Sequence, residues 1–336
     1  MRAAVVERYG GPEVVHVADV PLPEPGAEGV RVRVDAAAVT SGDARIRAAR
    51  FPPGFGVVAR PVFGIRRPRR RILGSAFSGV VDAVGERVGD LAPGEAVCGM
   101  AGSPMGAHAQ YVVVPAKKLV RTPAGVSHED GAGVLFGGTT ALHFLRDKAS
   151  VGPGTSVLVN GASGAVGTNA VQLATHFGGS VTGVTSAANA ALVTDLGAER
   201  VIDHTRVDLT EIDDRFDIVL DTVGNLSITS GRRLLRDGGT LVLVVASLGE
   251  MIRARGAVVA GPAPERVDDM ALLLGLVADG ELTVVHDQTF DLDHIVDAHR
   301  LVDGGHKRGN VVVCPWPTDG PTNGLAGGST GASTGG

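Results

Sequence analysis

Three glycines spaced three residues apart lie near the middle of this 336-residue chain, in the segment VNGASGAVG. They are Gly161, Gly164 and Gly167, and they stand between an apolar run, SVLVN, and a helix-like segment, TNAVQLATHF. A bare turn between a strand and a helix leaves N–H groups and the positive end of a helix dipole free to bind a phosphate. The spacing differs from the G-x-G-x-x-G typical of dinucleotide sites, so a tight turn without a ligand is the alternative.

The end of the next predicted strand indicates which dinucleotide such a loop would bind. NAD sites usually carry an acidic residue there, roughly 20 residues beyond the first glycine. Here the segment reads GVTSAAN, and the next acid, Asp195, falls inside the following predicted helix. Thr185, Ser186 and Asn189 offer neutral donors that tolerate a 2′-phosphate, although no Arg or Lys stands beside them in the sequence. We therefore predict NADPH as the cofactor.

The segments around the loop predict an α/β protein. From about residue 124 the chain alternates between strands and helices, and strands rich in Val and Leu without polar alternation are typical of a parallel sheet covered on both faces. Residues 1–123 read as short strands broken by Gly and Pro, in which Val30, Val32 and Val34 alternate with arginines. We expect a β-rich domain and a Rossmann domain with a doubly wound parallel sheet. Residues 317–336, rich in Gly, Ser and Thr, are predicted to be disordered.

Composition argues against several other classes of protein. The net charge is −5, and the basic run at residues 66–71 has no aromatic residues between its arginines, so we predict no nucleic-acid partner. A solvated loop is the favoured interpretation of that run, and a rim that attracts an anionic substrate or cofactor is the alternative. No apolar run approaches the about 18 residues of a membrane span. Cys98 and Cys314 form neither a disulfide framework nor a zinc cluster, which favours a cytoplasmic protein.

Several motifs, in their order along the chain, resemble the zinc-independent medium-chain dehydrogenase/reductases and, within them, the quinone oxidoreductase-like branch. These motifs are VTSGDARIR, GGTTALHFL, VLVNGASGAVGTNAVQLA, LGAERVID, DTVG and GHKRGNVVV. The resemblance implies a GroES-like catalytic domain, residues 1–123 and 263–316, around a Rossmann domain, residues 124–262, with the active site in the cleft between them. It also implies a homodimer joined through edge strands of the Rossmann sheet, around TLVLVV.

The same resemblance implies a role for individual residues. The pyrophosphate would lie on the loop from Gly161 to Gly167, at Ser163, Gly164, Ala165 and Val166, and the 2′-phosphate near Ser186 and Asn189. The nicotinamide side would be lined by Ser41, Asp43, Thr140, Val223, Ala246, Gly309, Asn310 and Val311. Asp43 has a turn-capping carboxylate as its alternative role, and Thr140 has the N-cap of a helix over ALHFLRDK.

Neither a zinc site nor a proton donor is apparent in the sequence. Zinc-dependent relatives use an early Cys and a Gly-His-Glu, whereas VTSGDARI and GSAFSG offer no thiolate or imidazole. The branch often has an acid where Ala76 stands. Phe51 occupies the place of a tyrosine that donates a proton in some enoyl reductases of the superfamily. His108 and Tyr111 are alternative donors, although buried His and Tyr in a β domain are more often structural.

These absences favour particular acceptors. Hydride transfer leaves a negative oxygen on the acceptor, and something must stabilise it. A simple ketone leaves a strongly basic alkoxide, an enone leaves an enolate, and a quinone leaves a stabilised hydroquinone anion. We therefore predict NADPH-dependent reduction of a quinone or activated enone without zinc. The alternatives are enoyl reduction in specialised, polyketide-type metabolism and a dinucleotide-binding protein with little turnover.

Overall fold

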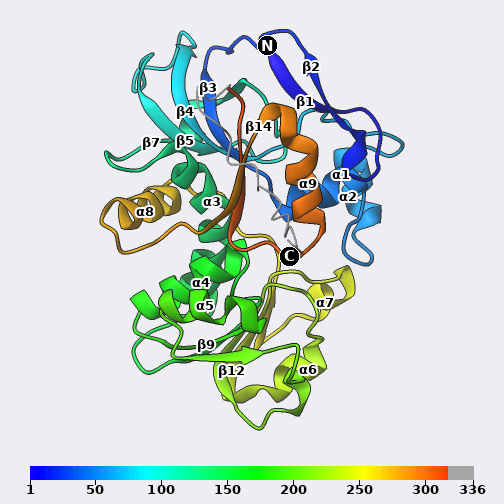
Figure 1. Cartoon of the computed structure of the whole chain (residues 1–336), viewed down its shortest axis with the longest axis vertical. Helices are drawn as coiled ribbons and strands as arrows, with labels where there is room; N and C mark the ends of the chain where they lie inside the picture. The colour runs from blue at the N-terminus through cyan, green and yellow to red at the C-terminus, as the bar shows by residue number, and fades with distance from the viewer. Residues whose placement is uncertain (317–336) are drawn as a thin grey trace, which may run out of the picture.

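The computed structural model describes residues 1–316, which form two lobes stacked along the long axis of the molecule (Figure 1). The predicted disorder of residues 317–336 lies outside the described residues. Within residues 1–316, no helix is both long enough and apolar enough to cross a bilayer.

The lower lobe is built on a parallel sheet of six strands in the order β10-β9-β8-β11-β12-β13. The strands are β8 (Ser156–Asn160), β9 (Ser180–Thr185), β10 (Arg200–Asp203), β11 (Phe216–Asp221), β12 (Leu235–Leu243) and β13 (Val258–Ala260). Numbered within the lobe, this order is 3-2-1-4-5-6, the order of the Rossmann fold. The predicted doubly wound parallel sheet is therefore confirmed.

Both faces of this sheet are covered, as its apolar strands predict. Val157 and Val159 on β8 pack into one hydrophobic cluster, and Leu158 between them packs into another. Because alternate side chains of a strand point to opposite faces, the clusters lie on opposite sides of the sheet. The helices that follow the strands are α4 (Ala165–His176), α5 (Ala190–Asp195), α6 (Ile228–Arg233) and α7 (Leu248–Arg253).

The upper lobe contains a seven-stranded sheet in the order β14-β15-β3-β4-β5-β7, with β6 paired to β3. Its strands are β3 (Gly29–Ala38), β4 (Ala76–Val84), β5 (Ala96–Met100), β6 (Tyr111–Pro115), β7 (Leu119–Arg121), β14 (His286–Asp291) and β15 (Asn310–Cys314), beside the hairpin of β1 (Arg2–Val6) and β2 (Val15–Asp19). Its helices are α1 (Ser41–Ala48), α2 (Gly56–Phe63) and α9 (Ile295–Asp303). Val30, Val32 and Val34 are buried in its core, as their alternation predicts.

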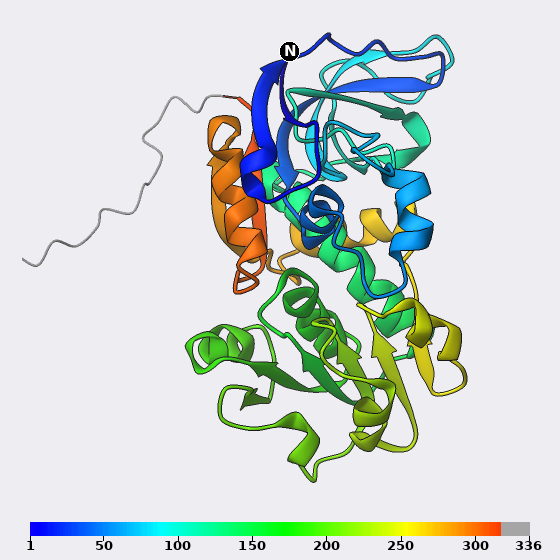
Figure 2. The same cartoon turned by 90° about the vertical axis from the view of Figure 1, so that its right-hand side faces the viewer.

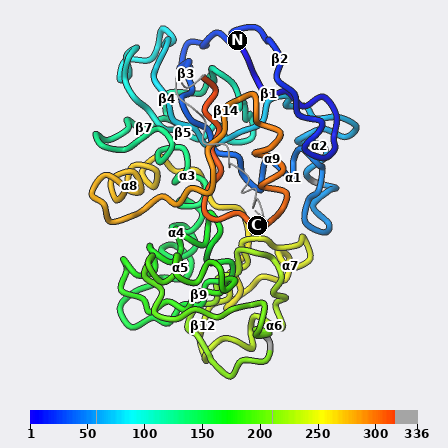
Figure 3. Tube along the Cα trace, viewed as in Figure 1, coloured from blue at the N-terminus to red at the C-terminus, as the bar shows by residue number. Residues whose placement is uncertain are grey.

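Distant parts of the chain meet in the upper lobe. The trace in Figure 3 shows the C-terminal β14 and α9 beside the N-terminal segments, because β15 pairs with β3 across residues Ala37–Ala38. Helix α3 (His128–Leu142), continued by a π-helical turn over His143–Lys148, runs between the lobes (Figure 2). It packs on β3 and β4 above, on α4 below and on α8 (Val267–Ala278). The residue limits of the domains stay a prediction.

The location of the predicted dimer edge is wrong in one respect. The segment TLVLVV begins within β12, which lies between β11 and β13 and is therefore not an edge strand. The side of β12 that faces away from β11 is already paired, because Leu241, Val242 and Leu243 form hydrogen-bonded pairs with β13. The short strand β13, which the sequence analysis did not identify, forms that edge of the sheet. The homodimer itself stays a prediction.

Candidate active site

Each of the three glycines in the loop between β8 and α4 is required for a different structural reason. Gly161 has φ 83°, a conformation that favours glycine. A Cβ on Gly167 would lie 2.1 Å from the Gly161 carbonyl oxygen, so α4 packs tightly against the turn. A Cβ on Gly164 would lie 3.4 Å from that same oxygen, its nearest neighbour, so this position opens outward. Gly164 is therefore where a ligand has space to approach the backbone.

The N-terminus of α4 is suited to an anion. Gly164 is its N-cap residue, no side chain caps it, and its first turn has no acidic residue. By contrast, α6 and α7 are capped by Ser227 and Ser247, whose side chains accept hydrogen bonds from backbone N–H groups. The first N–H groups of a helix need partners from outside the helix. The start of α4, at Ala165 and Val166, therefore fits a pyrophosphate group.

The residues predicted near the 2′-phosphate lie together with Ser163. Thr185 Oγ1 donates to Ser163 Oγ over 2.8 Å, and Asn189 Nδ2 donates to the same oxygen over 3.3 Å. Asn189 Nδ2 also lies 3.4 Å from Ser186 Oγ. These neutral side chains form one network at the carboxyl ends of β8 and β9, where open α/β sheets bind ligands. Their roles in cofactor binding stay a prediction.

An acidic residue that was not predicted for the site, Asp203, lies beside this network, since it pairs with Thr185 across the sheet. Asp203, the last residue of β10, accepts hydrogen bonds from Thr205 N at 3.0 Å and Thr205 Oγ1 at 2.8 Å. These bonds, together with one from the Ala187 backbone, hold the pKa of Asp203 below its usual value. The sequence held a signal for this residue, because Asp203 ends the segment RVID, the predicted strand that follows β9. Asp203 is an anion whose lone pairs are partly engaged by the turn itself.

The strand β15 begins against the glycine loop. Gly309 N donates to Ser163 O over 2.8 Å, and the two segments form a parallel bridge at Gly164 and Gly309. Asn310 Nδ2 donates to Val285 O over 3.0 Å, and Val311 is buried in the core of the upper lobe. The structure therefore brings Gly309 to the predicted pyrophosphate site, while Asn310 and Val311 hold the strand in place.

Lys307 is a cation that the sequence analysis did not assign to the site. Its Nζ donates to the carbonyl oxygen of Gly309, the residue immediately before β15. Burial lowers the pKa of Lys307 to about 8. Through Gly309 and Ser163, this ammonium is linked to the network that contains Asn189. Lys307 lies in the motif GHKRGNVVV, but no local pattern in the sequence shows that this segment returns to the glycine loop.

The loop after β11 is fixed by a buried carboxylate. Asp221, fully buried, accepts hydrogen bonds from Asn160 Nδ2 at 2.9 Å and from Val223 N and Gly224 N at 3.0 Å each. A fourth bond comes from Leu226 N at 3.0 Å. The resulting tight turn leaves Val223, which was predicted to line the nicotinamide, 50% exposed at this edge of the sheet.

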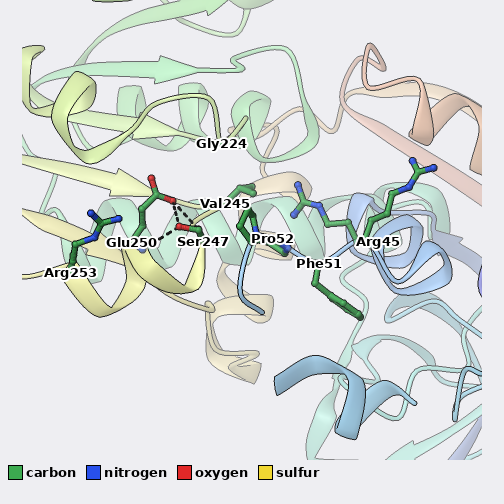
Figure 4. Close-up of a pocket in the computed structure, with 10 residues that line it drawn as sticks. Arg45, Phe51, Pro52, Gly224, Val245, Ser247, Glu250 and Arg253 are labelled. Carbon is green, nitrogen blue, oxygen red and sulfur yellow. Dashed lines mark hydrogen bonds between the residues drawn. The ribbon is translucent and has the colours of Figure 1, made fainter. Parts of the chain in front are cut away.

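A cavity of about 420 Å³ lies between the two lobes. Its lining comes from the upper lobe (Arg45, Arg50, Phe51, Pro52, Pro53) and from the lower lobe (Gly224, Val245, Ser247, Glu250, Arg253), as Figure 4 shows for the residues that it labels. Leu248 N donates to Pro53 O over 2.9 Å, so the start of α7 is joined directly to the upper lobe. Phe51 stacks on Phe63 of α2, with ring centroids 6.0 Å apart. Phe51 therefore lies in the wall of this cavity, and its predicted place beside the reacting group of the acceptor stays a prediction.

Ala246, which was predicted to line the nicotinamide, does not line this cavity, and its contact with the cofactor stays a prediction. Ala246 is buried with the apolar residues beneath the sheet, whereas its neighbour Val245 lines the cavity. Strand β12 ends at Leu243, and Ser247 caps α7. The residues between them therefore do not follow strand alternation.

Asp43 performs the capping role that was its alternative. Its Oδ2 accepts hydrogen bonds from Thr40 N at 2.8 Å and Thr40 Oγ1 at 2.6 Å, and its Oδ1 accepts one from Gly74 N at 2.9 Å. The side chain is buried at the start of α1, where Ser41 is exposed in the first turn. A further role of Asp43 or Ser41 beside the nicotinamide stays a prediction.

The alternative role of Thr140 as an N-cap is wrong. Helix α3 begins at His128 behind the cap residue Ser127 and passes through Thr140. The Thr140 hydroxyl donates to Phe136 O, one turn earlier, over 2.8 Å. Helix boundaries depend on caps and packing, and the pair of glycines before Thr140 does not end this helix. Its predicted contact with the cofactor is untested.

The two alternative proton donors lie away from the cavity lining. His108 is 1% exposed, with Nε2 3.1 Å from Ala38 O and its ring edge-on to His299. Tyr111 packs edge-on against Trp316. Both therefore serve packing in the upper lobe. Within residues 1–316, no three His, Cys, Asp or Glu side chains are grouped as metal ligands, and the zinc-free site stays a prediction that rests on residue types.

A Rossmann sheet with an open glycine loop, facing a β-rich lobe across a cavity, defines a dinucleotide-dependent oxidoreductase. Two family models match the chain: the alcohol dehydrogenase GroES-like domain over residues 26–124 and the zinc-binding dehydrogenase over residues 196–313. A quinone oxidoreductase from Pseudomonas aeruginosa is 30% identical over 331 residues, which cover 91% of this chain and 97% of that protein. The chain belongs to the medium-chain dehydrogenase/reductases, in the quinone oxidoreductase branch, and is an NAD(P)H-dependent oxidoreductase.

Two further comparisons define the extent of the likeness. The structure of the quinone oxidoreductase from Coxiella burnetii superposes with a TM-score of 0.85 at 29% identity, covering 94% of this chain and 99% of that one. The pikromycin polyketide synthase component PikAII of Streptomyces venezuelae is 32% identical over 267 residues, 73% of this chain. The matched region is only 7% of that synthase component, so the chain resembles one small part of it.

Proposed function

We propose that the protein uses NADPH to reduce a quinone or an activated enone, without zinc. The observation that carries this proposal is the cavity between the lobes. It adjoins Gly224 and Val245 at the ends of the Rossmann strands, and the Phe51–Pro53 segment forms its opposite wall. Bound in the cleft, NADPH supplies the hydride, and the protein's own residues hold the cofactor and shape the acceptor site.

The choice of NADPH rests on the charge and hydrogen-bonding character around the turn after β9. Ser186 and Asn189 provide neutral donors there, and the loop has no carboxylate of its own. Lys307 adds an ammonium group on the β15 side of Ser163, which favours a ligand with an extra phosphate. Asp203 opposes this preference, although Thr205 and Ala187 engage its carboxylate.

The acceptor class follows from the stability of the anion that hydride transfer leaves. Phe51 has no proton to donate, and His108 and Tyr111 are packed in the upper lobe. A hydroquinone anion needs the least stabilisation from the protein, an enolate needs more, and an alkoxide needs the most. The site therefore suits quinones and activated enones better than simple ketones.

The test is an assay of NADPH oxidation with 1,4-benzoquinone, methyl vinyl ketone and acetone at matched concentrations. We expect turnover with the first two acceptors, little with acetone, a lower kcat/KM for NADH, and no loss of activity with a chelator. Efficient reduction of acetone would contradict the proposal, because a proton donor or metal would then have to act. NADPH binding without turnover of any acceptor would favour the dinucleotide-binding alternative.

A second candidate is an enoyl reductase, which the similarity to part of PikAII favours. The same cavity would then receive an α,β-unsaturated thioester in place of a quinone. Comparison of kcat/KM for a crotonyl thioester and for benzoquinone separates the two. A thioester that is at least tenfold better, equivalent to about 1.4 kcal/mol of barrier, would assign the enoyl reductase function.

A further inference from the structure

The cavity between the lobes has an excess of positive charge. Three of its lining residues are arginines, Arg45, Arg50 and Arg253, and one is acidic, Glu250. The Glu250 carboxylate accepts hydrogen bonds from Ser247 N at 2.9 Å and Ser247 Oγ at 2.7 Å, which cap α7. The Glu250 carboxylate is therefore engaged by the start of α7 (dashed lines in Figure 4), and among residues 1–316 its hydrogen bonds are to Ser247 and not to the arginines of the cavity.

Arg45 has an environment that is unusual for an arginine. It lies in α1, partly buried, and within residues 1–316 its side chain has neither a hydrogen bond nor an acidic partner. Two residues further on, the buried Arg47 is paired with Asp303. Burial lowers the pKa of Arg45, because the loss of part of its hydration disfavours the charged form of the guanidinium. An anion in the cavity would offset part of this loss by pairing with the guanidinium.

The backbone after α1 brings further cations to the same space. Ala49 has φ 49° and ends the helix, and Arg50 N donates to Arg45 O over 2.9 Å in the turn that follows. On the opposite wall, Arg253 Nε donates to Gly249 O over 3.0 Å, which leaves its terminal nitrogens available. Both lobes therefore present guanidinium groups to one cavity.

We propose that this cavity binds an activated alkene that carries an anionic group, either a carboxylate or a phosphate, and that Arg45 is the main partner of that group. The inference rests on the proposed reductase function and names its substrate class. A planar guanidinium binds a carboxylate or phosphate through two parallel hydrogen bonds. A cavity of about 420 Å³ holds a small molecule of this kind. A neutral quinone would leave the Arg45 charge uncompensated.

The test compares two acceptors that share a carbon skeleton, one with a carboxylate and one with a neutral ester, and the mutant corrects for their different intrinsic reactivity. With 4-oxopent-2-enoate and its methyl ester, we expect the wild-type protein to prefer the acid by at least tenfold in kcat/KM, and Arg45→Met to reduce this ratio to below twofold. Arg45→Lys should retain part of the preference. Arg233→Met is the matched control, because it removes an exposed arginine on α6, outside the cavity lining, and should leave the ratio unchanged.

A second pair of acceptors separates the two sources of negative charge. Crotonyl-coenzyme A and crotonyl-pantetheine share the reacting thioester, and only the first carries phosphates. A preference for the coenzyme A thioester that Arg45→Met removes would assign a phosphate-bearing substrate. A preference restricted to 4-oxopent-2-enoate would assign a carboxylate, and both results support the anion site.

Binding without turnover provides an independent measurement. The saturated acid 4-oxopentanoate should raise the melting temperature of the wild-type protein and should not raise that of Arg45→Met. An acid-to-ester ratio near one in the wild type, or an equal loss for acid and ester in Arg45→Met, would overturn the inference. A loss of NADPH affinity in Arg45→Met would assign the guanidinium to the cofactor and would also overturn it. Failure of every acceptor would refute the proposed function, and the melting-temperature shift would still decide on the anion site.

Discussion

The substitution Gly164→Val should abolish NADPH binding in a protein that stays folded. Gly164 has φ −81° and ψ 174°, an extended conformation that valine adopts readily. The nearest atom to its added Cβ would be the Gly161 carbonyl oxygen at 3.4 Å, an ordinary contact. The Cβ would therefore fit the protein, and we expect the valine methyl groups to occupy the space above the first N–H groups of α4.

The expected loss of affinity follows from the hydrogen bonds that become inaccessible. A hydrogen bond to a charged group contributes roughly 1.5–3 kcal/mol, so the loss of two such bonds at Ala165 and Val166 amounts to roughly 3–6 kcal/mol. Because 1.4 kcal/mol corresponds to a factor of ten, the Kd for NADPH should rise at least 100-fold. Fluorescence titration measures this Kd, and circular dichroism measures the melting temperature of the same sample.

Gly167→Ala is the control that separates binding from folding. Its Cβ would lie 2.1 Å from Gly161 O and 2.7 Å from Ala162 Cα, both backbone atoms that do not move aside easily. Overpacking of this kind costs about 1–3 kcal/mol, which lowers the melting temperature by several degrees. A folded Gly164→Val protein with unchanged NADPH affinity would show that this loop does not hold the pyrophosphate.

Three further predictions concern the cofactor and the acceptor. Ser186→Asp should shift preference from NADPH to NADH in kcat/KM, because a carboxylate accepts from the ribose 2′-hydroxyl and repels a 2′-phosphate; a wild-type preference for NADH would contradict the reasoning. The pKa of Lys307 is lowered to about 8, so its ammonium is charged below that pH and neutral above it. The Kd for NADPH should therefore rise between about pH 7 and about pH 9 in the wild type and stay flat in Lys307→Met, and parallel pH profiles would exclude a role for this lysine. Phe51→Tyr should raise kcat for methyl vinyl ketone at least tenfold by supplying a proton and change benzoquinone reduction by less than that; equal effects on both would place residue 51 away from the reacting oxygen.

The local pattern of the sequence was sufficient to predict the fold class and the glycine loop. The apolar strand before Gly161 and the helical stripe after Gly167 are periodicities of neighbouring residues, and they predict β8, the turn and α4 without any tertiary information. The alternation of Val30, Val32 and Val34 with arginines likewise predicts a strand with one buried face. Secondary structure and burial of this kind depend on residues within a few positions of one another.

Element boundaries were less predictable, because packing decides them. Thr140 lies inside α3, since contacts with both lobes continue the helix past its glycines. The segment TLVLVV is interior because β13 pairs with its strand. The chain leaves the sheet after Leu243, where β12 ends, so Val245 reaches the cavity lining. In each case the end of a helix or strand lies a few residues from its predicted position, and the elements that pack against the segment decide where it ends.

The composition of the candidate site was decided by tertiary structure alone. Gly309 reaches Ser163, and Lys307 binds the Gly309 carbonyl, because β15 joins the upper lobe and begins against the glycine loop. Arg45 and Arg253 share a cavity because the upper lobe and α7 are joined there, at Pro53 and Leu248. These groups are far apart in sequence, and no local periodicity relates them. Only long-range packing brings such charges together, because the energy of burying both cores fixes where the two lobes meet.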